Sequence, residues 1–205
     1  MRLRGAVIMA MVLCLPALGW AAFTLSHQLV VGGNTPPELH QFIPADPPRP
    51  APAISVTDGA GNALTLADFR GRFVLVNLWA TWCEPCIREM PSLDRLQGAL
   101  SGADFAILLI SQDRGGERVV APFFEKLGLA RLKTALDPQS TAGRAFAVRG
   151  LPTSILIDRE GNVLGSVEGA LNWDAAAAQA LLRWYIARGA KTPDPDDVVK
   201  TSAER

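Results

Sequence analysis

The feature that most constrains this chain is the apolar run of residues 73–79, FVLVNLW, together with the cysteine pair that follows it. A near-continuous apolar run of this length is typical of a central strand buried on both faces. We expect a helix from about Cys83 to about Leu100, because Pro85 is acceptable in a first turn and Pro91 introduces a kink. The sequence therefore predicts a buried strand that leads into a helix, with Cys83 at the amino-terminal end of that helix.

Cys83 and Cys86 form a C-x-x-C motif, and their position at the start of a helix favours redox chemistry. The free N–H groups and the dipole of a helix stabilise a thiolate at its amino-terminal end, and a thiolate is the species that attacks disulfides. Cys86 lies about one turn further along the same face, close enough to form a disulfide with Cys83. We interpret Cys83 as the nucleophile and Cys86 as the resolving thiol.

Other interpretations of the cysteine pair fit the sequence less well. The two cysteines could be half of a zinc site, but such a site needs further ligands. The other cysteine, Cys14, and the two histidines, His27 and His40, all lie before the body of the chain. The same distribution excludes a Cys–His protease site and a histidine general base in that body. Two buried cysteines acting as small hydrophobes, or a structural disulfide that constrains the unfolded chain only slightly, stay as alternatives.

Composition limits the class of protein further. The 205 residues suffice for one domain of ordinary size with attached segments, and a hydrophobic content of 49% suffices for a core. Lys plus Arg and Asp plus Glu balance at 20 each, so the chain lacks the basic footprint that a nucleic-acid partner requires. Three cysteines are too few for a scaffold held together by disulfides.

The amino-terminal segment predicts a membrane anchor. Residues 5–23 form an uncharged apolar run after the basic Arg2 and Arg4, and a helix that crosses a bilayer needs roughly 20 apolar residues. Because basic residues stay on the cytoplasmic side, residues 1–31 are expected to be a cytoplasmic stub and a transmembrane helix. A cleaved signal peptide with a small-x-small site at residues 17–19 is the alternative. Both interpretations place the rest of the chain outside the cytoplasm.

Three further regions follow the anchor. Residues 32–52 are rich in proline, and we expect an extended linker without a core that holds the following domain off the membrane. Residues 53–190 are expected to form the folded domain. Residues 191–205 are polar and broken by proline, and we expect a frayed tail there.

Strand and helix patterns alternate through residues 53–190 and end in a hairpin around residues 158–162. This order predicts an α/β fold with a mixed central sheet and helices on both faces. The last, alanine-rich helix is expected to be capped by Asn172 or Asp174 and to end near Gly189. The predicted strands are residues 53–57, 73–79, 105–110, 132–136, 153–157 and 163–167, and the other helices are residues 83–100, 117–127 and 141–148.

The segment Trp82-Cys83-Glu84-Pro85-Cys86 after an apolar strand resembles the thioredoxin superfamily. The longer pattern resembles its membrane-tethered branch, the TlpA/ResA/CcmG (DsbE) thiol-disulfide oxidoreductases, over about residues 51–188. This resemblance implies a thioredoxin fold with an N-terminal strand or hairpin addition and a βα insertion between Cys86 and Pro152, preceded by an N-terminal membrane helix. The matching segments are residues 51–54, 66–71, 74–91, 150–153 and 157–161.

The resemblance also implies roles for individual residues. Pro152 matches the family's cis-proline, which lies beside the cysteine pair and, flanked by Leu151 and Thr153, offers backbone to an incoming peptide. An ordinary proline at the start of a strand is the alternative. Glu89 matches an acidic residue near the second cysteine, where a buried carboxylate disfavours the Cys86 thiolate and can relay its proton. A solvated glutamate on the helix surface is the alternative for Glu89.

Three residues around the cysteines and one strand residue complete the candidate site. The resemblance implies that Glu84 and Pro85, which separate the cysteines, tune the redox poise. Trp82 is expected to be a packing residue that also borders the active surface. Asn77 is a departure, because it occupies the strand position where thioredoxin has a buried aspartate that accepts a proton. Since asparagine cannot take a proton, that role moves to Glu89, to water, or is absent.

These features together predict a protein-disulfide reductase on the periplasmic side of the bacterial inner membrane. The resemblance implies clients such as apocytochrome c or a copper-centre assembly protein, and re-reduction by a membrane electron donor of the DsbD/CcdA type. We expect a monomer anchored in the bilayer, without metal or organic cofactor, whose redox group is the Cys83–Cys86 disulfide.

Three alternative functions stay open. A dithiol oxidant would use the same motif, because the direction of electron flow depends on the reduction potential. A thiol peroxidase would need a threonine two residues before its cysteine in a loop that starts with proline; Thr81 has the offset, but the proline is missing. A Sco-like metal-binding module would need a wider cysteine spacing and a histidine.

Overall fold

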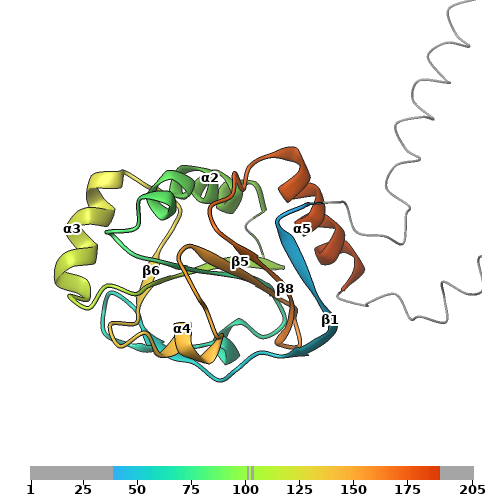
Figure 1. The fold of residues 1–205 in the computed structure, drawn as a ribbon, viewed down its shortest axis with the longest axis horizontal. Coiled ribbons are helices and arrows are strands. Elements are labelled where there is room, and N and C mark those ends of the chain that lie inside the picture. The colour runs from blue at the N-terminus through green and yellow to red at the C-terminus, as the bar shows by residue number, and fades with distance from the viewer. Residues whose placement is uncertain (1–38, 101, 103, 190–205) are drawn as a thin grey trace, which may run out of the picture. The chain divides into compact units, whose positions relative to one another are not determined.

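The computed structural model describes residues 39–100, 102 and 104–189, and within them the strands form one sheet in the order β1-β8-β7-β4-β5-β6-β2-β3 (Figure 1). Parallel and antiparallel pairs both occur in this sheet, as the sequence predicts. The strands are β1 (Phe42–Pro50), β2 (Ser55–Thr57), β3 (Ala63–Thr65), β4 (Phe73–Trp79), β5 (Phe105–Ser111), β6 (Thr134–Leu136), β7 (Thr153–Ile157) and β8 (Asn162–Glu168).

Strand β4 is the buried central strand that the apolar run predicts. All of its residues are buried, and it pairs parallel with β5 and antiparallel with β7. Alternate side chains of the strand enter two separate hydrophobic clusters, one on each face of the sheet. Phe73, Leu75 and Trp79 join the cluster that includes α2, so Asn77, which lies between them in the alternation, faces the same side.

Helices cover both faces of the sheet, which gives the thioredoxin-like α/β fold that the resemblance implies (Figure 1). The core cluster on one face takes residues from α2, α3 and α5, and the cluster on the other face takes residues from α4 and the short 3₁₀ helix η1. The bounds are η1 (Leu66–Phe69), α2 (Glu84–Leu100), α3 (Glu117–Leu127), α4 (Thr141–Ala145) and α5 (Ala176–Arg188).

Strand β1 contradicts part of the linker prediction, because residues 42–50 pair antiparallel with β8 at the edge of the sheet. The register shifts between Pro44 and Arg49, and an edge strand tolerates proline because its outer side needs no ladder hydrogen bonds. Phe42 anchors the strand against Tyr185, with ring centroids 5.9 Å apart. A Cβ at Gly165 would lie 2.3 Å from the Phe42 ring, so glycine there permits the close approach of β1 to β8.

Two helix boundaries also differ from the prediction. Helix α5 begins after Ala175, so neither Asn172 nor Asp174 caps it, and Asp174 instead forms an ion pair with Arg95 of α2. Helix α4 ends at Ala145 rather than near residue 148, because Ala147 adopts a positive φ of 55° that a helix cannot continue through.

The predicted membrane anchor at residues 1–31 and the predicted tail at residues 191–205 lie outside the described residues. Among the residues that the structure does describe, no helix combines the length and apolarity needed to cross a bilayer.

Asp137 holds the start of α4 in place. Its carboxylate accepts hydrogen bonds from the Thr141 amide and hydroxyl, the Ala142 amide and the Gln112 side chain, at 2.7–3.0 Å. Burial alone would raise the pKa of Asp137, but these hydrogen bonds outweigh it and lower the pKa below 3.8. The carboxylate therefore stays charged and fully bonded at neutral pH.

We expect Asp137→Ala to lower the free energy of unfolding by about 3 kcal/mol, because several buried donors lose their acceptor together. Urea unfolding at pH 7 measures the change. Asp104→Ala is the matched control, since its exposed ion pair with Arg159 is worth at most about 1 kcal/mol. In the wild-type protein the Asp137 contribution is present above pH 3.8 and is lost as the pH falls through the lowered pKa. A loss for Asp137→Ala no larger than that for Asp104→Ala would contradict this role.

Candidate active site

Cys83 occupies the amino-terminal end of α2, as the strand-to-helix pattern predicts. Its carbonyl oxygen accepts the Ile87 amide at 3.1 Å, and its Sγ accepts the Cys86 amide at 3.3 Å. Cys83 and Cys86 are joined by a disulfide, with their Cα atoms 5.3 Å apart. Cys83 is 5% exposed and Cys86 is fully buried, so an incoming reactant meets Cys83 first. The amide that contacts the Cys83 sulfur is the type of donor that stabilises a thiolate.

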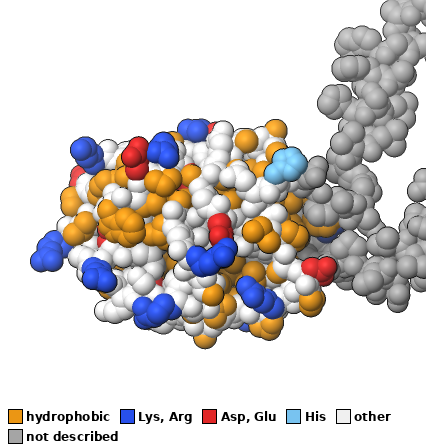
Figure 2. All heavy atoms as spheres, in the orientation of Figure 1, with side chains coloured by type: hydrophobic (Ala, Val, Ile, Leu, Met, Phe, Trp, Pro, Cys, Tyr) orange, Lys and Arg blue, Asp and Glu red, His pale blue; other side chains and the backbone are white. Residues whose placement is uncertain are grey.

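The residues between and before the cysteines lie at the surface. Trp82 is 70% exposed, which is unusual for a side chain of its size and shows that the expected packing role is wrong. Glu84 forms an exposed ion pair with Arg88 at 2.9 Å, and Pro85 lies in the first turn of α2. Hydrophobic side chains gather over α3 and the start of α2 on the face seen in Figure 2, with Lys and Arg side chains around them.

The Leu151–Pro152 peptide bond is cis, as the resemblance implies. Strand β7 pairs Thr153 with Leu78 near the end of β4, so Pro152 lies at the edge of the sheet from which the chain leads to Cys83. The Pro152 carbonyl accepts the Gly169 amide at 2.8 Å, and the Thr153 hydroxyl donates to the Gly150 carbonyl at 2.8 Å. Within the described residues the backbone of Leu151, beside Pro152, takes part in no hydrogen bond.

Glu89 is buried, which excludes the alternative of a solvated surface glutamate. Its side chain is on the same helix as Cys86, three residues further on, and the residue is 3% exposed. One carboxylate oxygen accepts the Asn77 amide group at 2.7 Å, and the other accepts the Leu171 backbone amide at 3.0 Å and the Trp173 indole N–H at 3.3 Å. Burial raises the pKa of Glu89 to about 7, although these hydrogen bonds act in the opposite direction.

Asn77 holds the Glu89 carboxylate from the sheet side. Its side-chain amide donates to Glu89 and to the Ser154 hydroxyl, at 2.7 and 2.9 Å, while its Oδ1 is buried without a hydrogen-bond partner among the described residues. The asparagine at this position therefore serves as a donor to Glu89, in place of the proton acceptor that thioredoxin has there. Ser154 was missed by the sequence reasoning, although β7 places it directly opposite Asn77.

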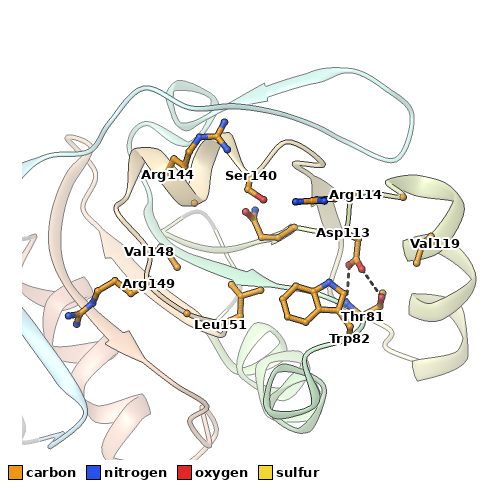
Figure 3. A pocket seen from close by; sticks show the side chains of 14 residues that line it. Thr81, Trp82, Asp113, Arg114, Val119, Ser140, Arg144, Val148, Arg149 and Leu151 are labelled. Atoms are coloured by element: carbon orange, nitrogen blue, oxygen red, sulfur yellow. Dashed lines mark hydrogen bonds between the residues drawn. The ribbon is translucent and has the colours of Figure 1, made fainter.

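An open cavity of about 890 Å³ lies beside Trp82 and Leu151 (Figure 3). Asp113 forms part of its wall and accepts hydrogen bonds from the Thr81 amide and hydroxyl at 2.9 and 2.6 Å, and from the Ser111 hydroxyl at 2.8 Å. Three arginines that the sequence reasoning did not single out also line this cavity: Arg114, Arg144 and Arg149. Arg114 follows β5, whereas Arg144 and Arg149 lie on α4 and just after it, so no local pattern in the sequence connects all three.

Comparison with known proteins places these features in a family. The model of the AhpC/TSA family matches residues 47–165. Thiol-disulfide oxidoreductase ResA from Bacillus thuringiensis subsp. konkukian is 33% identical over 121 residues, which cover 59% of this chain and 69% of the relative. ResA from Geobacillus kaustophilus is 35% identical over 121 residues, with 59% and 68% covered.

Solved structures show the same similarity. A putative thiol:disulfide interchange protein DsbE from Chlorobium tepidum superposes with a TM-score of 0.60 and 28% identity, over 68% of this chain and 95% of that protein. The thioredoxin domain of a thiol-disulfide oxidoreductase from Bacteroides vulgatus superposes with a TM-score of 0.57 and 26% identity, over 66% and 94% of the two chains.

Proposed function

Because the chain belongs to the AhpC/TSA family and is a thiol-disulfide oxidoreductase of the ResA/DsbE type, we propose that it reduces disulfides in client proteins outside the cytoplasm. The observation that carries this proposal is the position of the Cys83 sulfur at the start of α2, where it accepts the Cys86 amide. A thiolate formed at this sulfur is stabilised by that amide and by the helix dipole.

The reaction starts from the reduced dithiol. The Cys83 thiolate attacks one sulfur of the client disulfide, the client S–S bond breaks, and a mixed disulfide forms while the released client thiolate takes a proton. The Cys86 thiol then loses its proton and attacks the Cys83 sulfur. This second step releases the other client thiolate and leaves the Cys83–Cys86 disulfide, so that two electrons and two protons have passed to the client.

Glu89 supplies the proton acceptor for the second step in this proposal. Cys86 is fully buried and must lose its proton before it attacks, and bulk water has little access to it. A carboxylate with a pKa of about 7, on the same helix three residues away, can take that proton near neutral pH. The hydrogen bonds from Asn77 and Trp173 hold the carboxylate in one orientation while it does so.

Substrate contact is assigned to the surface around Cys83. Trp82 provides exposed apolar area next to the nucleophile, and the free backbone of Leu151 beside the cis Pro152 provides donors and acceptors for an extended client segment. Glu84 and Pro85 separate the two sulfurs and, in this proposal, set the redox poise. Clients such as apocytochrome c or a copper-centre assembly protein, and a membrane electron donor of the DsbD/CcdA type, fit this assignment.

The location is proposed from the sequence. The uncharged residues 5–23 after Arg2 and Arg4 support an anchor in the inner membrane, with the redox domain on the periplasmic side. Extraction of membranes with alkaline carbonate, after expression of the full chain, tests the anchor, since an integral protein stays in the membrane pellet. Amino-terminal sequencing of the mature protein tests cleavage, because a new terminus near residue 20 would replace the anchor with a signal peptide.

The direction of electron flow is tested by the reduction potential of the dithiol, measured by equilibration against a defined thiol buffer. A potential near that of thioredoxin, about −270 mV, supports a reductase. A potential near that of DsbA, about −120 mV, would make the protein an oxidant. The absence of a reversible two-electron transition would return Cys83 and Cys86 to a structural role.

Peroxide reduction fits the site less well. Both the amide and the hydroxyl of Thr81 donate to Asp113, so the threonine that has the offset of a peroxidase residue is committed to another partner. Turnover of hydrogen peroxide in the same preparation provides the direct comparison, and a rate above that of client reduction would favour the peroxidase.

A further inference from the structure

We propose that the open cavity beside Trp82 binds a segment of the client protein that carries acidic side chains next to its disulfide. The cavity is called the arginine groove below and is defined by Trp82, Leu151, Arg114, Arg144 and Arg149. The inference rests on the proposed function, because it names the substrate class of the same dithiol.

The three arginines reach the groove from different parts of the fold. Arg114 lies in the loop between β5 and α3, Arg144 lies on α4, and Arg149 lies just before the cis-proline loop. All three are exposed. Figure 3 shows the Arg114 side chain extending across the opening toward Ser140, with Trp82 and Leu151 on the opposite side. The cations and the surface beside Cys83 therefore border one continuous opening.

Most of this positive charge has no carboxylate to balance it. Arg114 forms no hydrogen bond or ion pair within the described part of the chain, and Arg144 donates to a backbone carbonyl, that of Gln139, rather than to an acid. Arg149 adds less positive charge to the groove, because both carboxylate oxygens of Glu168 accept hydrogen bonds from its guanidinium group, at 2.8 and 2.9 Å. Since the whole chain has a formal net charge of zero, the groove is a local concentration of positive charge.

The acid that lines the groove, Asp113, offsets at most one of these positive charges and already accepts hydrogen bonds from the protein. Asp113 is buried, and its two oxygens are already occupied by hydrogen bonds from Thr81 and Ser111. Its carboxylate fixes the segment before Cys83 to the end of β5 and faces protein donors. A ligand in the groove therefore meets the guanidinium groups of Arg114 and Arg144, which pair with no carboxylate among the described residues.

An apolar strip connects the cations to the dithiol. Trp82 is 70% exposed, Val119 is 40% exposed, and Val148 and Leu151 are partly buried in the same lining. Exposed apolar area with separated cations suits an extended peptide better than a compact anion, because a peptide can contact both at once. When a cysteine of the client is bonded to Cys83, the client residues that follow it would lie over Trp82. The acidic side chains of the client would then reach the arginines of the groove.

The test compares two synthetic peptides, each closed by an internal disulfide and identical except for three Asp or three Lys residues after the second cysteine. The full chain in its dithiol form is mixed with each peptide, and the rate constant of reduction is measured. We expect the Asp peptide to react about 10-fold faster than the Lys peptide at an ionic strength of about 0.02 M. This preference should shrink to about 2-fold at 0.5 M, because salt screens exposed charges.

Reversing the charge of the groove arginines tests whether these residues cause the preference for the Asp peptide. The Arg114→Glu/Arg144→Glu variant is expected to invert the preference, so that the Lys peptide becomes the faster one. The Arg183→Glu/Lys126→Glu variant makes the same change in net charge at exposed positions of α5 and α3 outside this cavity lining, and should keep the preference for Asp. Thermal unfolding midpoints of the variants show that each remains folded.

The outcomes separate the inference from the proposed function. If the wild-type protein reduces hydroxyethyl disulfide and both peptides at one common rate, the groove does not select acidic clients and the inference fails while the reductase stands. A higher rate constant for oxidised glutathione than for the Asp peptide would also overturn it, since the groove would then take a small anion. If no disulfide is reduced at all, the proposed function itself fails.

Discussion

Cys86→Ser is expected to stop the reaction at the mixed disulfide, whereas Cys83→Ser is expected to abolish reaction with the client altogether. The physical reason is the difference in access and in electrostatic environment. Cys83 lies at the helix start and is in contact with the Cys86 amide, while Cys86 is fully buried beneath it. Both variants should lose multiple-turnover reduction by at least about 10³-fold, because each step of the exchange needs its own sulfur.

The two variants differ in the product that accumulates. After incubation with a disulfide-containing client, Cys86→Ser should give a covalent adduct that is seen by mass spectrometry and is released by dithiothreitol. Both substitutions are made in a Cys14→Ser background, which removes the third thiol of the chain and should retain full turnover when it is the sole change. An adduct formed by Cys83→Ser instead would reverse the assignment of nucleophile and resolving thiol.

The parts of the fold that the sequence predicts well are those with a strong local pattern. The run of residues 73–79 predicts β4 residue for residue, because burial on both faces makes the strand apolar except at Asn77. The bounds of α3 are also predicted, since Gly128 ends the helix in the left-handed conformation. The hairpin of β7 and β8 follows from the turn residues between them.

Strand β1 could not be predicted in the same way, because its composition hides its pairing. Residues 42–50 contain several prolines, and such a segment is usually extended and solvated. What places it in the sheet is the pairing with β8 and the packing of Phe42 on Tyr185. These partners lie more than a hundred residues away in the chain.

In the candidate site, too, local features are predicted by the sequence, whereas contacts with distant residues are not. The spacing of Glu89 from Cys86 predicts the helix face that the two residues share, and the structure adds that this face is buried. Two of the donors that hold the carboxylate, Leu171 and Trp173, come from the segment before α5, separated from Glu89 by 82 and 84 residues. The arginine groove depends in the same way on distant segments, because the fold brings Arg114 of the β5–α3 loop close to Arg144 of α4 and to Arg149 just after that helix.

The raised pKa of Glu89 predicts a pH dependence of stability. A folded-state pKa of about 7, against an ordinary value of 4.5, means that the folded protein binds more protons than the unfolded chain between these two values. The free energy of unfolding should therefore decrease as the pH rises through this window. The contribution is present below pH 4.5, is lost as the pH passes about 7, and amounts to about 3 kcal/mol.

Glu89→Gln is expected to remove this dependence, because glutamine stays neutral at every pH. Urea unfolding at pH 5 and pH 8.5 measures this dependence. Between these two pH values, the free energy of unfolding of the wild-type protein relative to the variant should fall by about 2.5 kcal/mol. Glu84→Gln is the matched control on the same helix, since Glu84 is exposed and its substitution should leave the pH slope of the unfolding free energy unchanged.

The same Glu89→Gln substitution should slow release of the client from the mixed disulfide by about 10²-fold at pH 7, because Cys86 loses its proton acceptor. Equal pH slopes for the wild-type protein and Glu89→Gln would mean that folding does not raise the pKa of Glu89, and its carboxylate would then be a much weaker acceptor for the Cys86 proton at neutral pH.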